Sequence, residues 1–152
     1  MAALETNTWH IRFIALLPLL MLPGVLIFDT SLYGTMLTDT SFASQMAPYL
    51  SPGYLLMLAG SWIAYLGSVP LAFFDHKYLT QHGIVRPFHW AFVFIGGFIY
   101  VIGRVVVVRS RTGKGVFPLW LAIAVQVALT IAIIVLSINM TNAMLEGILT
   151  SF

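Results

Sequence analysis

The sequence predicts an all-α integral membrane protein in which four hydrophobic helical segments pack as an antiparallel bundle. Hydrophobic residues make up 60% of the 152 residues and charged residues only 8%, whereas a soluble domain has about 25% charged residues. Apolar runs long enough to cross a bilayer recur along the chain, and the polar stretches between them are too short to form a second core. We therefore expect one integral membrane domain over residues 1–152.

The first span is predicted over residues 12–30. A collar that includes Trp9 and Arg12 precedes its apolar run. Because no small-residue cleavage site follows cleanly, we interpret the run as a retained helix and not as a removed signal peptide. Pro18 and Pro23 each remove a backbone donor and clash with the preceding turn, so they predict a bend.

The second span is predicted over residues 53–74, which carry no formal charge. The loop before it, residues 30–52, holds Asp39 and neither Lys nor Arg, so the positive-inside rule places it away from the cytoplasm. Its Ser51-Pro52-Gly53 end is typical of a helix start. Small residues four positions apart on this span form a face that another helix can approach closely. They are Gly60, Ala64 and Ser68.

The third and fourth segments are predicted over residues 87–108 and 116–140, after a short interfacial connector over residues 75–86. In the fourth segment, Gln126 and Thr130 are expected to form hydrogen bonds between helices. Beyond it we expect only a weakly amphipathic tail. Small residues at helical spacing predict a second packing face on the fourth segment. They are Ala124, Ala128 and Ala132.

The third segment admits two paths. If it crosses the membrane, three of the seven basic residues lie on one side and four on the other. The positive-inside rule then favours neither orientation. If Gly96-Gly97 is the tip of an intramembrane hairpin, all seven fall on the cytoplasmic side, opposite Asp29 and Asp39. Irregular backbone at membrane depth survives only when it is buried in protein or lies beside water, whereas glycine is common in membrane helices. We therefore expect the crossing and keep the hairpin as the alternative.

Arg104 lies inside this third segment and also has two interpretations. Its guanidinium either forms a buried ion pair or extends toward the headgroups. In a full crossing, Asp29 lies at the same membrane boundary and is the expected partner, whereas a hairpin separates the two residues. The basic residues near the end of the segment are predicted to anchor the protein to anionic phospholipids. They are Arg104, Arg109, Arg111 and Lys114.

No catalytic or cofactor-binding pattern is visible, so we expect neither enzymatic activity nor a cofactor. Cysteine is absent, which excludes disulfides and thiolate metal sites. His89 is expected to form hydrogen bonds at the interface, since a metal site with His76 and His82 has no supporting spacing. Asp75 is expected to be a satisfied boundary charge, with proton transfer to His76 as the alternative. The net charge of +2 is too small and too localised to indicate nucleic acid as a partner.

The block RPFHWAFVFIGGFIYVIGRVVVVRSRTGKG, residues 86–115, resembles a family of uncharacterised small polytopic membrane proteins from high-GC Gram-positive bacteria. That family has a PFHWAW-type entry, a YVIGR centre and a VRRRTGRG-type exit, and here an FD and the connector precede the block. The resemblance covers about a third of the chain. It implies a multi-pass protein of the bacterial plasma membrane and supplies no catalytic residues. The matching positions are Pro87, Phe88, His89, Trp90, Tyr100, Val101, Ile102, Gly103, Arg104, Arg111, Thr112, Gly113 and Gly115.

Small-residue faces, aromatic collars and a basic anchor, without visible chemistry, favour a non-catalytic accessory or stabilising subunit of a larger bacterial membrane complex. That complex would be respiratory or transport-related, and the partners would be the lipid bilayer and other membrane subunits. The alternative is a small homo-oligomeric transporter or channel with charged residues at the span ends. An enzyme acting on a lipid or quinone would require Asp75, His76 and His89 to converge.

Overall fold

The computed structural model describes residues 6–150, and the side chains of residues 6–149. Within this range the chain is helical and contains no strand. It forms two compact units, and the long helices α5 (Pro52–Gln81) and α7 (Phe117–Thr150) contribute to both. The first unit comprises the chain up to Leu19 together with Trp62–Val127; the second comprises Leu20–Ser61 and the chain from Ala128 onward.

Three helices are long and apolar enough to cross a membrane: Trp9–Leu26, Pro52–Gln81 and Phe117–Leu149. They overlap the first, second and fourth predicted spans, residues 12–30, 53–74 and 116–140. The first helix ends at Leu26, before the predicted end, and the last continues to Leu149 through the predicted tail. The third predicted segment, residues 87–108, does not form such a helix.

The first of these helices changes its hydrogen bonding along its length. It consists of α1 (Trp9–Leu16), the 3-10 helix η1 (Leu17–Met21) and α2 (Leu22–Leu26). Pro18 lies in η1 and Pro23 in the first turn of α2. Because proline has no N–H to donate, these two residues interrupt regular α-helical bonding, as the sequence indicated.

The predicted loop over residues 30–52 contains two short helices, α3 (Ser31–Thr38) and α4 (Phe42–Leu50). Ser41 caps α4 by accepting a hydrogen bond from the backbone N–H of Ser44. The Asp39 carboxylate accepts from the Ser41 backbone N–H at 2.9 Å and from the Ser44 hydroxyl. These hydrogen bonds lower the pKa of Asp39, the Ser44 hydroxyl being the largest cause.

Helix α5 begins at Pro52, and the Ser51 hydroxyl accepts from the backbone N–H of Tyr54 at 3.3 Å. This is the predicted start. The end differs, because the helix runs through the predicted connector to Gln81. Leu79 in this extension is fully buried, so packing stabilises a stretch whose charges had indicated a membrane interface. Asp75 therefore lies inside the helix instead of just beyond its end.

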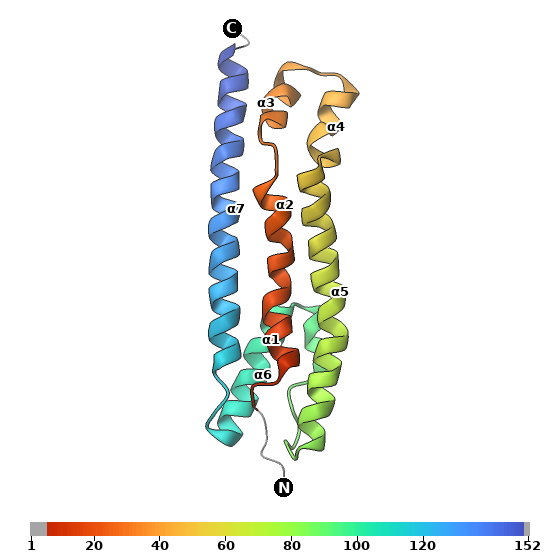
Figure 1. Ribbon diagram of the computed structural model, residues 1–152, viewed down its shortest axis with the longest axis vertical. Coiled ribbons are helices and arrows are strands. Elements are labelled where there is room, and N and C mark those ends of the chain that lie inside the picture. Colours follow the sequence, from red (N-terminus) through yellow and green to blue (C-terminus); the bar gives the residue numbers. More distant parts are fainter. Residues whose placement is uncertain (1–5, 151–152) are drawn as a thin grey trace. The chain divides into compact units, whose positions relative to one another are not determined.

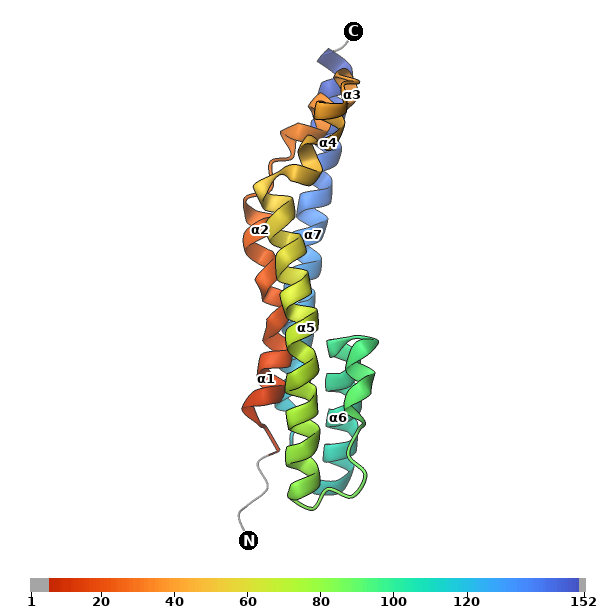
Figure 2. The same ribbon diagram turned by 90° about the vertical axis from the view of Figure 1, so that its right-hand side faces the viewer.

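The third predicted segment folds back on itself instead of forming one continuous helix. A 3-10 helix, η2 (Trp90–Phe94), leads to Gly96, after which α6 (Gly97–Thr112) returns alongside it (Figure 2). The Phe88 ring packs directly on Gly103, where a Cβ atom would overlap the ring. The structure therefore corrects the expected straight helix and has the hairpin that the charge distribution had suggested.

The hairpin gathers three helix ends within the first unit. The start of α1, the carboxyl end of α5 and the carboxyl end of α6 lie at the same end of this unit (Figures 1 and 2). Gly113 ends α6 in the left-handed conformation, with φ of 69°, the usual role of glycine at a helix terminus. The exposed basic residues of these ends and their connections are Arg12, Lys77, Arg86, Arg109, Arg111 and Lys114.

In the second unit, glycines bring helix backbones together. A Cβ atom on Gly24 would lie 2.5 Å from the backbone nitrogen of Met57, and one on Gly60 would overlap the carbonyl oxygen of Leu20. Gly34 of α3 and Gly147 of α7 meet in the same manner. Close approach of this kind is what small residues permit in helix packing.

Candidate functional site

An ion pair lies in the interior of the first unit. The guanidinium Nε of Arg104 lies 3.1 Å from Asp75 Oδ2, and Nη2 lies 3.3 Å from Oδ1, so the two groups form a forked pair. Both side chains are fully buried. Arg104 comes from α6 and Asp75 from α5, and the pair therefore joins the returning arm of the hairpin to the long helix.

Two hydroxyl groups complete the coordination of the carboxylate. Thr8, just before α1, donates to Asp75 Oδ1, and the Tyr100 hydroxyl lies 3.1 Å from Oδ2 and 3.2 Å from the Ala72 carbonyl oxygen. Tyr100 and Arg104 are four residues apart on α6 and so share one helix face. Arg104 Nη1 donates to the backbone carbonyl of Thr6. The network thus connects the beginning of α1, α5 and α6.

The role of this network can be inferred from its burial and its hydrogen bonds. A buried charge is tolerated when it is paired and its remaining hydrogen-bonding positions are filled. Both oxygens of Asp75 are occupied by donors, and Tyr100 is also fully buried. Removing one partner of such a pair costs about 3–5 kcal/mol, since the other charge is left uncompensated. We therefore interpret the network as a clamp that holds the hairpin.

Further contacts attach the entry arm of the hairpin to α5. His76 Nδ1 lies 3.0 Å from the backbone carbonyl oxygen of Phe88. One turn earlier, the Phe73 ring meets the Trp90 ring edge-on, with 5.7 Å between their centroids. The His89 imidazole accepts a hydrogen bond from the Ala91 N–H and so caps η2. Irregular backbone is stabilised here by packing on both sides.

The structure changes the roles expected of Arg104 and Asp29. The carboxylate partner of Arg104 is Asp75, whereas Asp29 accepts hydrogen bonds from the backbone and hydroxyl of Ser31. The predicted pair depended on one continuous helix over residues 87–108, which does not form. Being fully buried, Arg104 is also removed from the predicted headgroup anchor. The exposed members of that anchor are Arg109, Arg111 and Lys114.

The two predicted packing faces differ in burial. On α5, Gly60, Ala64 and Ser68 are all buried. On α7, Ala124 and Ala128 are exposed and Ala132 is half-buried. The inward face of α7 is formed instead by Ala122, Val125 and Leu129.

The histidines do not assemble a metal site. The rings of His76 and His89 are 5.6 Å apart, but His82 Nδ1 lies 2.8 Å from the Tyr78 carbonyl of its own helix. Among the described residues, no group of three or more His, Cys, Asp or Glu side chains is placed to hold a metal ion.

Neither Thr8 nor Tyr100 was predicted as a site residue. A signal for Tyr100 was present, because it stands four residues before Arg104, the helical spacing that places two side chains on one face. Tyr100 and Arg104 both belong to the YVIGR string, and Asp75 is the acid of the FD that precedes the 86–115 block. Thr8 carries no comparable signal, since only tertiary structure brings it to Asp75. Comparison with protein families, curated proteins and solved structures gives no match to this chain.

Proposed function

We propose that this chain is a non-catalytic accessory subunit that stabilises a larger membrane complex, respiratory or transport-related, in the plasma membrane of a bacterium. We also propose that it belongs to the family that its 86–115 block resembles. Its three apolar helices would cross the membrane and its hairpin would enter and leave on the cytoplasmic side.

The fully buried Asp75–Arg104 ion pair is the main observation that supports this proposal. A transporter that used these charges would need to expose them to water or substrate during its cycle. Here both side chains are fully buried and bonded to each other. The rival function, a small homo-oligomeric transporter, is thus less well supported, because the charges expected along its path are engaged in holding the hairpin.

Charge distribution supports the proposed topology. All seven Lys and Arg residues belong to the first unit, and residues 13–76 and 115–152 contain none. With a hairpin, the positive-inside rule assigns every basic residue to the cytoplasmic side. The exposed ones there would contact anionic lipid headgroups.

Cysteine labelling tests the topology directly, since the chain has no native cysteine. His82→Cys before the hairpin and Ser110→Cys after it are both expected to react with an impermeant maleimide from the cytoplasmic side. Thr38→Cys is expected to react only from the opposite side. Labelling of the first two variants from opposite sides would show that residues 87–108 cross the membrane.

The outward face of α7 is the surface on which we place the partner subunit. Ala124 and Ala128 are exposed there, one helical turn apart, beside Trp120, which is 66% exposed. Small residues next to a large one on an outward helix face let another helix approach closely.

Purification in mild detergent from native membranes, followed by mass spectrometry, tests the function. One defined set of larger membrane proteins in constant ratio is expected. Ala128→Trp should release it, whereas Ile134→Trp, on another exposed face of α7, should retain it. Recovery of the chain alone, with substrate transport in liposomes, would replace the proposal with the transporter function.

A further inference from the structure

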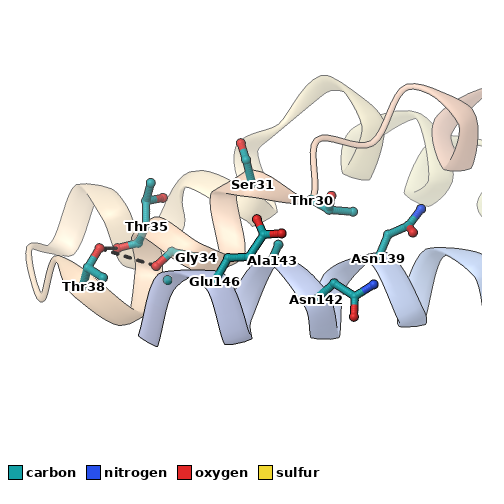
Figure 3. Close-up of a pocket in the computed structure, with 10 residues that line it drawn as sticks. Thr30, Ser31, Gly34, Thr35, Thr38, Asn139, Asn142, Ala143 and Glu146 are labelled. Atoms are coloured by element: carbon teal, nitrogen blue, oxygen red, sulfur yellow. Dashed lines mark hydrogen bonds between the residues drawn. The ribbon is translucent and has the colours of Figure 1, made fainter. Parts of the chain in front are cut away.

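The second unit contains a polar groove of about 480 Å³ between α3 and the carboxyl-terminal part of α7 (Figure 3). Asn139 and Glu146 extend from α7 toward the segment that carries α3. The polar side chains along the groove are Thr30, Ser31, Thr35, Thr38, Asn139, Asn142 and Glu146.

Hydrogen bonding within α3 makes this groove rich in acceptors. The Thr35 hydroxyl donates to the Leu32 carbonyl at 3.0 Å, and the Thr38 hydroxyl donates to the Thr35 carbonyl at 3.2 Å. The Ser31 hydroxyl donates to Asp29 at 2.7 Å. Each hydroxyl has one proton and two lone pairs, so these three present oxygen lone pairs to a ligand. Glu146 adds a carboxylate, and a ligand with several donors therefore fits best.

Charge narrows the class of ligand further. The second unit contains Asp29, Asp39 and Glu146 but no Lys or Arg, because the sequence has none in residues 20–61 or 128–152. An anionic headgroup would find no cation there, whereas an ammonium group would find a carboxylate. Quaternary ammonium groups are usually held in aromatic cages, and the residues lining the polar groove include no aromatic side chain. A primary ammonium, with three N–H donors, matches the acceptors.

A second groove of about 320 Å³ adjoins the first and is lined mostly by apolar residues. It lies between residues 25–30 and residues 132–139, and Thr30 and Asn139 line both grooves. The apolar groove follows the more central part of α7, and the polar groove follows the part nearer its carboxyl end. Along α7 toward its carboxyl end, the apolar groove is therefore followed by the polar groove, as the acyl chain of a phospholipid is followed by its headgroup.

We propose that the adjoining grooves bind a membrane phospholipid with a primary ammonium headgroup. Its ammonium lies at Glu146 and the hydroxyls of α3, the amide groups of Asn139 and Asn142 face its phosphate and glycerol oxygens, and one acyl chain lies along Ala132 and Leu136.

Lipid retention measured by native mass spectrometry tests this site. The full chain, purified in detergent, is incubated with phosphatidylethanolamine, phosphatidylcholine and phosphatidylglycerol of identical acyl chains. We expect phosphatidylethanolamine to be retained about tenfold better than phosphatidylcholine, and Glu146→Gln to remove that advantage, since one charge-assisted hydrogen bond is lost. Asp39→Asn, which removes a carboxylate of the same unit outside the groove, should change nothing.

Further experiments distinguish binding of the whole phospholipid from binding of its headgroup alone. Ala132→Phe fills the apolar groove and should reduce retention of ethanolamine lipid while the helical content stays constant. Soluble ethanolamine at the same concentration should not displace the lipid. The proposal is overturned if phosphatidylcholine is retained equally, if Glu146→Gln leaves the preference intact, or if ethanolamine alone competes. The proposal is also contradicted if the retention of phosphatidylglycerol depends on Glu146. Retention of phosphatidylglycerol that is independent of Glu146 is explained by the basic residues at the end of the first unit.

Discussion

The two units of this protein treat polar groups in opposite ways. In the first unit, Asp75, Arg104 and Tyr100 are fully buried and bonded to one another. In the second, Ser31, Asn139 and Glu146 line an open groove. The packing differs as well, because side chains hold the hairpin of the first unit, whereas glycine backbones meet in the second.

This difference shows how to interpret a polar residue in an apolar chain. A group whose partners are all within the protein specifies the path of the backbone, and its removal is expected to change folding before it changes binding. A group that lines an open groove is expected to change binding first. Substitutions in the two units test this division.

Breaking the buried pair should be the most destabilising change. Arg104→Leu leaves Asp75 buried without its counter-charge, and we expect a loss of about 3–5 kcal/mol of stability. Thermal unfolding in detergent and proteolysis at the hairpin measure the loss. The double variant Asp75→Leu/Arg104→Leu should recover part of it, since neither charge is then left alone. Arg109→Leu, exposed on the same helix, is the matched control, and an equal loss there would refute the clamp.

Gly60→Ala should follow, with a loss of about 1–3 kcal/mol, the usual cost of overpacking. The new methyl group would overlap the backbone carbonyl of Leu20, and a backbone cannot move aside as a side chain can. Gly67→Ala on the same helix is the control, because its Cβ would lie 3.5 Å from a Leu17 methyl group, an ordinary contact. Equal thermal stability of the two variants would contradict the proposed backbone contact.

Gly103→Ala should have a smaller effect, about 1 kcal/mol, at the lower end of the overpacking range. Its methyl group would meet the Phe88 ring, which can shift slightly in the hairpin. Phe88→Leu provides the space, so the double variant Gly103→Ala/Phe88→Leu should be more stable than the sum of the two single changes predicts. Strict additivity in a double-mutant cycle would show that the ring and the glycine do not interact.

The sequence was sufficient to predict the three long apolar helices, because hydropathy and length depend on local composition. It also predicted the start of α5 at Pro52, since the signal of the Ser51-Pro52-Gly53 string acts within one turn. The end of α5 was not predicted. Asp75, His76 and Lys77 indicate an interface by their polarity. Asp75 is buried because side chains distant in the sequence bond it, the Arg104 guanidinium among them.

The site was predictable only in part, because its ion pair depends on contacts between residues that are distant in the sequence. A buried ion pair at Arg104 was one of two interpretations, but its partner depended on the path of residues 87–108. A crossing favours Asp29, whereas a hairpin keeps Arg104 on the side that holds Asp75. The charge count favours the hairpin, whereas the frequency of glycine in membrane helices favours the crossing. Neither interpretation could have placed Thr8, whose role comes from the start of α1.

The smallest effect is expected at Asp39, a carboxylate that is exposed and bonded only to its own turn. Its pKa lies below the ordinary value of 3.8 because of hydrogen bonds from Ser44 and Ser41. A lowered folded-state pKa contributes stability that is present above the ordinary value and is lost as the pH falls through the folded-state pKa. Ser44→Ala removes the largest cause, so the Asp39 pKa measured by carboxyl NMR should rise toward 3.8, whereas Thr40→Ala should leave it in place. Because water screens this turn, the pKa should move while the thermal stability of the helices at neutral pH stays constant, and a large loss of stability would place Asp39 with the buried groups of the first unit.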